Sequence, residues 1–115
     1  MWMINPKLLC RKHLLGEHSE IHKHKPSFLK QHKIKGRIFP IVLIEPAMMK
    51  IRHDQLAEEM IKRNYNHKSP YEMPDLSYLP ENQTYAKVDI KVSLKELKNR
   101  CKDCKENIEK ELKND

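Results

Sequence analysis

The sequence predicts an all-α fold, with about three main helices in a single domain that spans residues 1–115. Three observations support this prediction. Apolar residues recur at helical spacing in three separate segments, and helix-start signatures precede two of them. The chain contains only 2 glycines, so a glycine-rich phosphate-binding loop and the nucleotide-binding folds built on one are excluded. Charged residues make up 34% of the chain, which is typical of long solvated helical faces.

The first predicted helix runs from Leu8 to about Lys25. One sector of this helix is expected to face the core, and it carries Leu14, Leu15, His18, Ile21 and His22. A second sector carries side chains at spacings of four, three and four residues, namely His13, Glu17, Glu20 and His24. Pro26 is expected to end or kink the helix because proline lacks a backbone N–H donor, and residues 27–31 could resume it. Residues 33–39 are expected to form a basic, exposed connection.

The second predicted helix starts at Glu45 and Pro46 and ends at about Arg63. Proline is tolerated in the first helical turn, and an acidic residue there is favoured by the helix dipole. The preceding apolar run, residues 41–44, is expected to be buried as a strand or as an approach to this helix. The residues expected to be buried on the helix itself are Met49, Leu56, Met60 and Ile61. Residues 64–66 are expected to end this helix.

The last part of the chain combines an irregular segment with a third predicted helix. Residues 67–83 contain three prolines and are expected to be irregular. Ser93 and Glu96 match a capping box, so we expect the third helix to run from Leu94 towards Leu112. Cys101 and Cys104 are separated by two residues on this helix, without a second such pair or a preceding strand. We therefore interpret them as ordinary thiols rather than as a metal or redox site.

The basic charge is concentrated in the first forty residues. They hold nine lysines and arginines against Glu17 and Glu20, whereas the remaining 75 residues hold 14 basic and 14 acidic side chains. A local positive field of this kind attracts a polyanion such as DNA. The side chains expected to neutralise DNA phosphates are Arg11, Lys12, Lys23, Lys25, Lys30, Lys33, Lys35 and Arg37.

Two kinds of site are compatible with the polar residues of the first helix. A carboxylate inside a DNA-binding face can stabilise a developing cation or move a proton, although a merely solvated helix face is the alternative. His18 and His22 have the spacing that zinc can bridge, but the sequence shows no third ligand. We therefore expect no metal and no cofactor. Arg52 and His53, on the second helix, could reach the same surface.

Several of these residues resemble the phage pyrimidine-dimer DNA glycosylase family, also called endonuclease V. The family opens with Ile-Asn and continues with His-Leu-Met-Ala-Glu-Tyr-Arg-Glu, and this chain has Ile4-Asn5 and residues 13–20 at the corresponding places. His13, Glu17 and Glu20 match by type and spacing. Residues 63–66 are similar to the family's Lys-Arg-Gly-Phe-Asn. Trp2 stands where the family exposes a threonine.

The resemblance implies an all-α DNA glycosylase with abasic-site lyase activity. In the family, the N-terminal α-amine attacks C1′ of the damaged nucleotide and forms an imine. A glutamate of the first helix, here Glu20, assists the sugar chemistry. The nucleophile of this chain would be the amine of Met1, supported by residues around it: Trp2, His13, Glu17, Arg52 and His53. An α-amine ordinarily has a pKa of about 8, so part of it is neutral near physiological pH.

The expected partner is double-stranded DNA that carries a damaged base or an abasic site, bound by a monomer with no membrane association. Three cysteines suit a reducing compartment, so we expect a cytoplasmic protein, in the host cytoplasm if the source is viral. Two alternatives stay open. One is a non-catalytic DNA-binding protein on the same scaffold, and the other is a metal-dependent nuclease that uses His18 and His22.

Overall fold

The computed structural model describes residues 1–67 and 69–113, with the backbone alone for residues 112 and 113. The described chain is all-α and contains no strand, which confirms the predicted fold class. The α-helices are α1 (Arg11–Leu29), α2 (Met49–Lys62), α3 (Glu81–Thr84), α4 (Ile90–Arg100) and α5 (Lys102–Lys113), and three short 3₁₀ helices are η1 (Pro6–Leu8), η2 (Lys35–Arg37) and η3 (Pro46–Met48). No helix in the described part of the chain is both long and apolar enough to cross a membrane.

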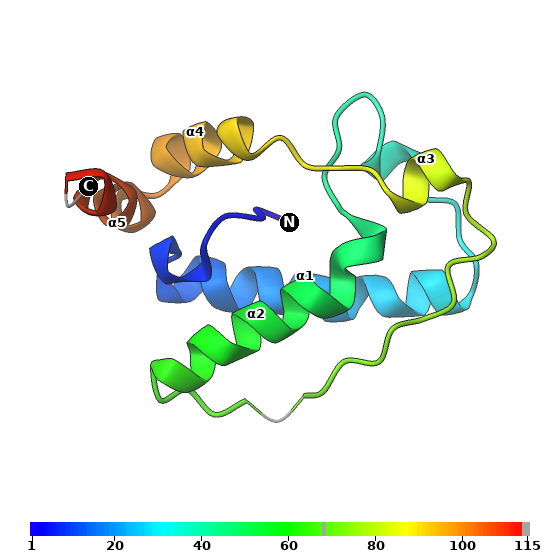
Figure 1. The fold of residues 1–115 in the computed structure, drawn as a ribbon, viewed down its shortest axis with the longest axis horizontal. Helices are drawn as coiled ribbons and strands as arrows, with labels where there is room; N and C mark the ends of the chain where they lie inside the picture. The colour runs from blue at the N-terminus through cyan, green and yellow to red at the C-terminus, as the bar shows by residue number, and fades with distance from the viewer. Residues whose placement is uncertain (68, 114–115) are drawn as a thin grey trace.

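Helices α1 and α2 pack against each other, and α4 and α5 form a second pair at one end of the molecule. The N-terminal segment, residues 1–5, runs between the α1–α2 pair and α4 (Figure 1). This arrangement brings the first residues of the chain close to residues 88–100, which no sequence pattern indicates.

Helix α1 begins and ends later than predicted. Cys10 precedes it in an extended conformation, and its carbonyl accepts the first helical hydrogen bond from Leu14 N–H. Pro26 lies inside α1 and does not end it. The helix continues because Phe28, in the last turn, is 1% exposed and packs into the core, while Lys30 N–H still reaches the Pro26 carbonyl. Burial of a phenylalanine contributes about 1.5–3 kcal/mol, which offsets the single lost backbone bond.

Helix α2 ends close to the predicted residue, but it starts at Met49, because residues 46–48 form the 3₁₀ helix η3; it buries Met49, Leu56 and Met60. Ile61, in contrast, is 61% exposed, so its predicted burial is wrong. Asn64 ends the helix region in a left-handed conformation with φ of 64°. Asparagine tolerates this conformation better than most residues, which makes the predicted stop at residues 64–66 effective.

The apolar run before α2 is mostly not buried. Ile41 is 62% and Leu43 46% exposed, whereas only Ile44 is fully buried. The run is neither a strand nor a helix. Its exposed members line the cavity described below, which explains why their apolar character did not lead to burial in the core.

The predicted third helix is two helices. Asp89, rather than Ser93, caps α4, because its carboxylate accepts hydrogen bonds from the N–H groups of Lys91 and Val92. Ser93 is buried inside the helix. Helix α4 ends at Arg100. Cys101 has an extended backbone, and α5 starts at the next residue. The predicted end of the helix falls at residues whose side chains lie outside the described part.

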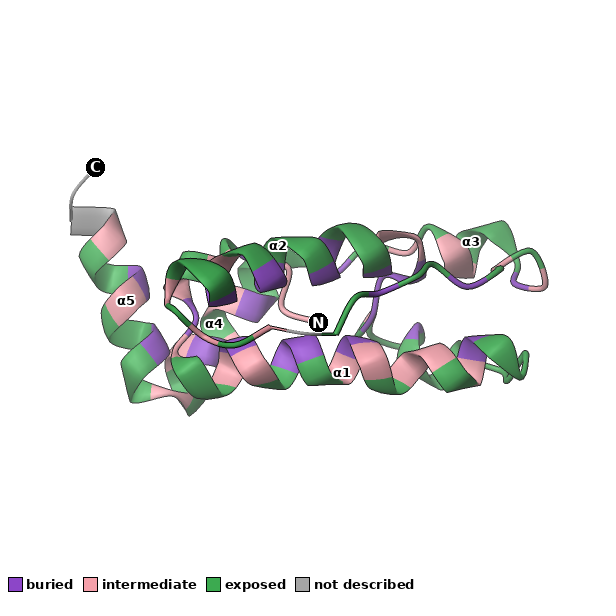
Figure 2. Ribbon diagram, turned by 90° about the horizontal axis from the view of Figure 1, so that it is seen from below, coloured by how far each residue is buried: buried purple, intermediate pink, exposed green. Residues whose placement is uncertain are grey.

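One hydrophobic core joins all these parts. It includes Ile4 of the N-terminal segment, Leu14 of α1, Leu56 of α2, Leu97 of α4 and Ile108 of α5. Figure 2 shows the buried residues of α1 and α2 on the faces that these two helices turn towards each other. The shared core fixes the N-terminal segment relative to both helix pairs.

Candidate active site

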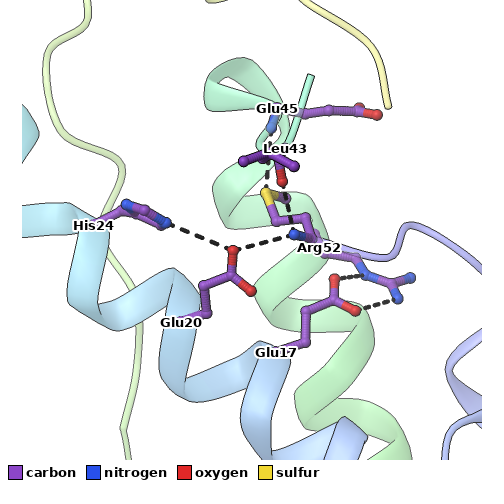
Figure 3. Close-up of polar contacts among 7 residues, drawn as sticks. Glu17, Glu20, His24, Leu43, Glu45 and Arg52 are labelled. Carbon is purple, nitrogen blue, oxygen red and sulfur yellow. Dashed lines mark hydrogen bonds and ion pairs between the residues drawn. The ribbon is translucent and has the colours of Figure 1, made fainter. Parts of the chain in front are cut away.

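The amine of Met1 and the carboxylate of Glu20 form the centre of the candidate site. The Met1 nitrogen donates to Glu20 Oε1 at 3.1 Å and to the carbonyl oxygen of Leu43 at 2.8 Å. Glu20 projects from α1 towards this amine (Figure 3). The side chain of Met1 is completely buried. The buried Met1 side chain and the two hydrogen-bond acceptors therefore fix the position of the amine.

Buried contacts fix the segment that carries the amine. Arg52 donates to both oxygens of Glu17, from Nε at 2.6 Å and from Nη2 at 2.9 Å (Figure 3). Its remaining Nη1 donates to the carbonyl oxygen of Ile4 at 2.6 Å. In addition, Glu45 N–H donates to the sulfur of Met1 at 3.3 Å. Glu20 of α1, Arg52 of α2 and the loop residues Leu43 and Glu45 therefore hold the N-terminal segment at Met1 and Ile4.

The environment of Glu20 favours the charged carboxylate. Partial burial raises the pKa of Glu20, but the His24 imidazole and the Met1 ammonium outweigh it, so the net pKa lies below the ordinary value. His24 Nε2 lies 3.6 Å from Oε1, one helical turn further along α1. A carboxylate kept negative beside an amine can stabilise positive charge on a neighbouring carbon and accept a proton from the amine.

The amine and Glu20 line an open cavity of about 650 Å³. Its apolar lining residues are Pro40, Ile41, Val42, Leu43, Val88 and Val92. A second hollow of about 290 Å³ adjoins it, and Glu20 and Arg37 line both. Lys87 and Arg100 also reach the larger cavity. Sequence reasoning missed these two cations because they lie in the charge-balanced part of the chain, and no local pattern marks them.

The predicted phosphate-binding side chains do not all lie at this cavity. Arg37 lines both hollows and Lys23 lines the smaller one. The Arg11 guanidinium lies 4.7 Å above the Tyr65 ring and the Lys25 ammonium 5.4 Å from the Tyr71 ring centre. The remaining four, all exposed, are Lys12, Lys30, Lys33 and Lys35. The structure thus places Lys23 and Arg37 next to Glu20 and directs Arg11 and Lys25 towards aromatic rings.

The residues predicted to support the Met1 amine lie in different surroundings. Glu17 and Arg52 are buried and hold the N-terminal segment, so they support the site through structure. His13 lies elsewhere, because its Nδ1 is 3.1 Å from Cys10 Sγ and its ring meets the edge of Trp2 at a centroid distance of 5.9 Å. Trp2 itself lines the large cavity.

His53 belongs to a separate group of histidines. Its ring lies 4.8 Å from His18 and 4.9 Å from His22. His67 Nε2 comes within 2.9 Å of His18 Nε2. The ring nitrogens of His18, His53 and His67 lie within 4.8 Å of one another. The predicted His18–His22 pair therefore gains neighbours from α2 and from the segment after it, which the sequence alone did not indicate.

The fold and the site together define a small helical protein that presents an amine–carboxylate pair in an open cavity with cationic side chains at its edge. A family profile described as pyrimidine dimer DNA glycosylase matches residues 1–73, and the chain belongs to that family. No curated protein and no solved structure gave a significant match. The matched range contains Met1, Glu20 and Arg37, while α4 and α5 lie outside it. Membership connects the protein with DNA repair and with a DNA substrate.

Proposed function

We propose that this protein is a DNA glycosylase with abasic-site lyase activity, which acts on pyrimidine-dimer-like damage in duplex DNA through the Met1 amine. The observation that carries the proposal is the 3.1 Å contact between that amine and Glu20 at an open cavity. Family membership supports the glycosylase activity and the DNA substrate. The imine mechanism is inferred from the geometry and from the resemblance of residues 13–20.

In the first step, the Met1 amine loses a proton and its lone pair attacks C1′ of the damaged nucleotide. Glu20 Oε1 is within hydrogen-bonding distance and can accept that proton. The bond between C1′ and the base nitrogen breaks, and the base leaves with the electron pair and is protonated. The C1′–O4′ bond then breaks, O4′ leaves with the electron pair and takes up a proton, and the nitrogen lone pair forms the C1′=N bond of a protonated imine. The negative carboxylate of Glu20 stabilises the positive charge that develops at C1′.

In the second step, the imine acts as an electron sink for strand cleavage. A base removes a proton from C2′, the C3′–O bond breaks, and the phosphate leaves with that electron pair. Water then hydrolyses the imine, which releases the unsaturated aldehyde end and regenerates the amine. The described residues provide Glu20 as the base closest to the amine.

The cavity fits the need to reach C1′ of a nucleotide. An enzyme that attacks this atom in a duplex must take a nucleotide out of the base stack. A cavity of about 650 Å³ with several apolar lining residues can cover the faces of a base, and the cations that line it, Arg37, Lys87 and Arg100, can bind phosphates. The exposed apolar Ile41 and Leu43, which burial in the core does not explain, have a role in this arrangement.

Strand cleavage by a Glu20→Gln variant tests the proposal. Glutamine keeps the shape of the side chain but removes its charge and basicity, so cleavage of a duplex with an abasic site should slow by about 10²–10⁴-fold. Glu58→Gln is the matched control, because Glu58 is an exposed glutamate on α2, paired with Lys62. Equal rates for the Glu20 variant and the wild type would contradict the proposed role.

The chemistry of the cleaved ends separates the alternatives. Elimination leaves an unsaturated aldehyde at the 3′ end of the upstream DNA fragment. A metal-dependent nuclease would instead hydrolyse the phosphodiester and leave no sugar fragment of this kind. Hydrolytic ends that disappear in a His22→Ala variant would favour the nuclease. DNA binding without any cleavage would favour the non-catalytic alternative.

A further inference from the structure

Four potential metal ligands from the two ends of the chain meet beside the start of α1. They are Cys10, His13, Cys101 and Cys104, and their ligand atoms all lie within 4.8 Å of one another. His13 Nδ1 is 3.1 Å from Cys10 Sγ and 3.7 Å from Cys104 Sγ. The sulfurs of Cys10 and Cys101 are 3.7 Å apart. Cys10 and Cys101 are more than ninety residues apart in the sequence, so no local motif indicates this group.

Two of these spacings match those of ligands around one tetrahedral metal ion, and the third is close to them. With Zn–S bonds of about 2.3 Å and Zn–N bonds of about 2.0–2.1 Å, tetrahedral geometry puts neighbouring ligand atoms about 3.5–3.8 Å apart. Two of the three quoted distances are 3.7 Å, and the third is shorter by a few tenths of an ångström. Three thiolates and one imidazole are also a ligand set that zinc prefers to other common ions.

Two helix starts present the ligands. Cys10 directly precedes α1 and His13 lies in its first turn, while Cys101 directly precedes α5 and Cys104 lies in its first turn. Both pairs therefore have the same spacing of two intervening residues, which places both side chains on one side of a helix start. Backbone N–H groups point at the sulfurs: Cys10 N–H at Cys104 Sγ, 3.3 Å, and Cys104 N–H at Cys101 Sγ, 3.4 Å. Such donors and the helix dipoles stabilise thiolates.

We propose that Cys10, His13, Cys101 and Cys104 bind one structural zinc ion that fastens α4 and α5 to the N-terminal half of the protein. Four protein ligands leave no open position for a substrate, which is the pattern of structural rather than catalytic zinc. His13 and Glu20 are seven residues apart on α1, a rise of about 10 Å, so the ion lies away from the amine. The inference is independent of the proposed reaction.

The position of the site explains the need for such a link. Helix α4 contributes Val92, Glu96 and Arg100 to the large cavity, yet α4 and α5 lie outside the part of the chain that matches the family. Apart from Ile108 and Cys104, most of α5 is polar. A zinc ion with three thiolates carries one net negative charge, and exposed cations stand next to the ligands in the sequence: Arg11, Lys12, Lys102 and Lys105.

A disulfide is the competing explanation. The Cys10 and Cys101 sulfurs are 3.7 Å apart, against about 2.05 Å in a disulfide, and all three cysteines are free thiols. A disulfide would also leave one thiol and His13 without a part in the arrangement. Zinc accounts for all four groups.

Metal analysis of the full chain, purified under reducing conditions, tests the proposal. We expect one zinc per chain, and Co²⁺ in its place should give the intense absorption of a tetrahedral thiolate complex. This spectrum requires no variant that could fail to fold. Removal of zinc by a chelator should lower the melting temperature, and added Zn²⁺ should restore it.

Variants locate the ion. Cys101→Ser, at a half-buried position, should lower zinc content by at least about tenfold, whereas His13→Cys should retain it because cysteine is an equally good ligand. His67→Ala is the control, since His67 belongs to the separate histidine group with His18 and His53. The proposal would be overturned by a reduced protein that binds neither Zn²⁺ nor Co²⁺ in this geometry. Retention of zinc by Cys101→Ser, or its loss in His67→Ala, would also overturn it.

Discussion

Arg52 binds Glu17 with two parallel hydrogen bonds, 2.6 Å and 2.9 Å long, and both side chains are buried. This contact joins α1 to α2. Because the same guanidinium also donates to the Ile4 carbonyl, the pair supports the N-terminal segment that ends in the Met1 amine. The buried acid of the first helix thus has a structural task, and the half-buried acid one turn later, Glu20, meets the amine.

Replacement of Arg52 by methionine should destabilise the protein strongly. It leaves the Glu17 carboxylate buried without its partner, and removal of one partner from a buried ion pair costs about 3–5 kcal/mol. Urea unfolding measures this loss. The double variant Glu17→Met/Arg52→Met should recover much of it, because an apolar pair carries no buried charge. Lys62→Met, which breaks an exposed pair with Glu58, should cost less than about 1 kcal/mol. A small loss for Arg52→Met would refute the supporting role.

Stability should decrease in mild acid because of the histidine group. Burial, followed by the charges of His53, His22 and His67, lowers the pKa of His18 to about 4 from an ordinary 6.5. Below pH 6.5 the unfolded chain therefore binds a proton that the folded protein does not, and the free energy of unfolding falls until about pH 4. The contribution is fully present above the ordinary value. One such group gives a slope of up to about 1.4 kcal/mol per pH unit.

Urea unfolding as a function of pH checks this slope. A His18→Gln variant should show a shallower decrease, although the lowered pKa of His22 keeps part of it. His32→Gln is the control, because His32 is exposed. An unchanged slope in the His18 variant would show that the decrease has another origin.

Much of the fold could be predicted because local patterns fix it. The apolar spacing in α1 and α2 and the three prolines between residues 67 and 83 act over a few residues. Both helices are therefore present with shifted ends, and the proline-rich stretch is irregular over its described residues until the unpredicted short helix α3 (Glu81–Thr84). No local pattern marks the break at Cys101, whose sulfur lies 3.7 Å from that of Cys10 near the other end of the chain. Likewise, Pro26 does not end α1, because the burial of Phe28 outweighs the local preference.

The candidate site was predictable only in its first-helix part. Spacing indicated Glu17 and Glu20, and the family resemblance implied that Glu20 works with the Met1 amine, but neither showed that Glu17 pairs with Arg52. Helix spacing grouped His13 with the acids, whereas its nitrogen lies beside Cys10. Long-range contacts decide these differences, and residues 41–43 show the same effect, because they form a cavity wall instead of core.

DNA binding should depend on cations at the cavity more than on cations elsewhere. Arg37→Gln should weaken binding to duplex DNA and lower the salt slope by about one, because one phosphate contact is lost. Titration at several salt concentrations measures both quantities. Lys62→Gln, on an exposed part of α2, is the control and should leave the slope unchanged. Identical slopes for Arg37→Gln and the wild type would place the DNA on another face.

Trapping of the covalent intermediate tests the amine mechanism most directly. The protein is incubated with a duplex that contains an abasic site, in the presence of borohydride, which reduces an imine to a stable amine. Mass spectrometry of the digested adduct then identifies the attached residue. Our account predicts the sugar fragment on the α-amine of Met1, beside Glu20. An adduct on a lysine side chain, or strand cleavage without any adduct, would contradict it.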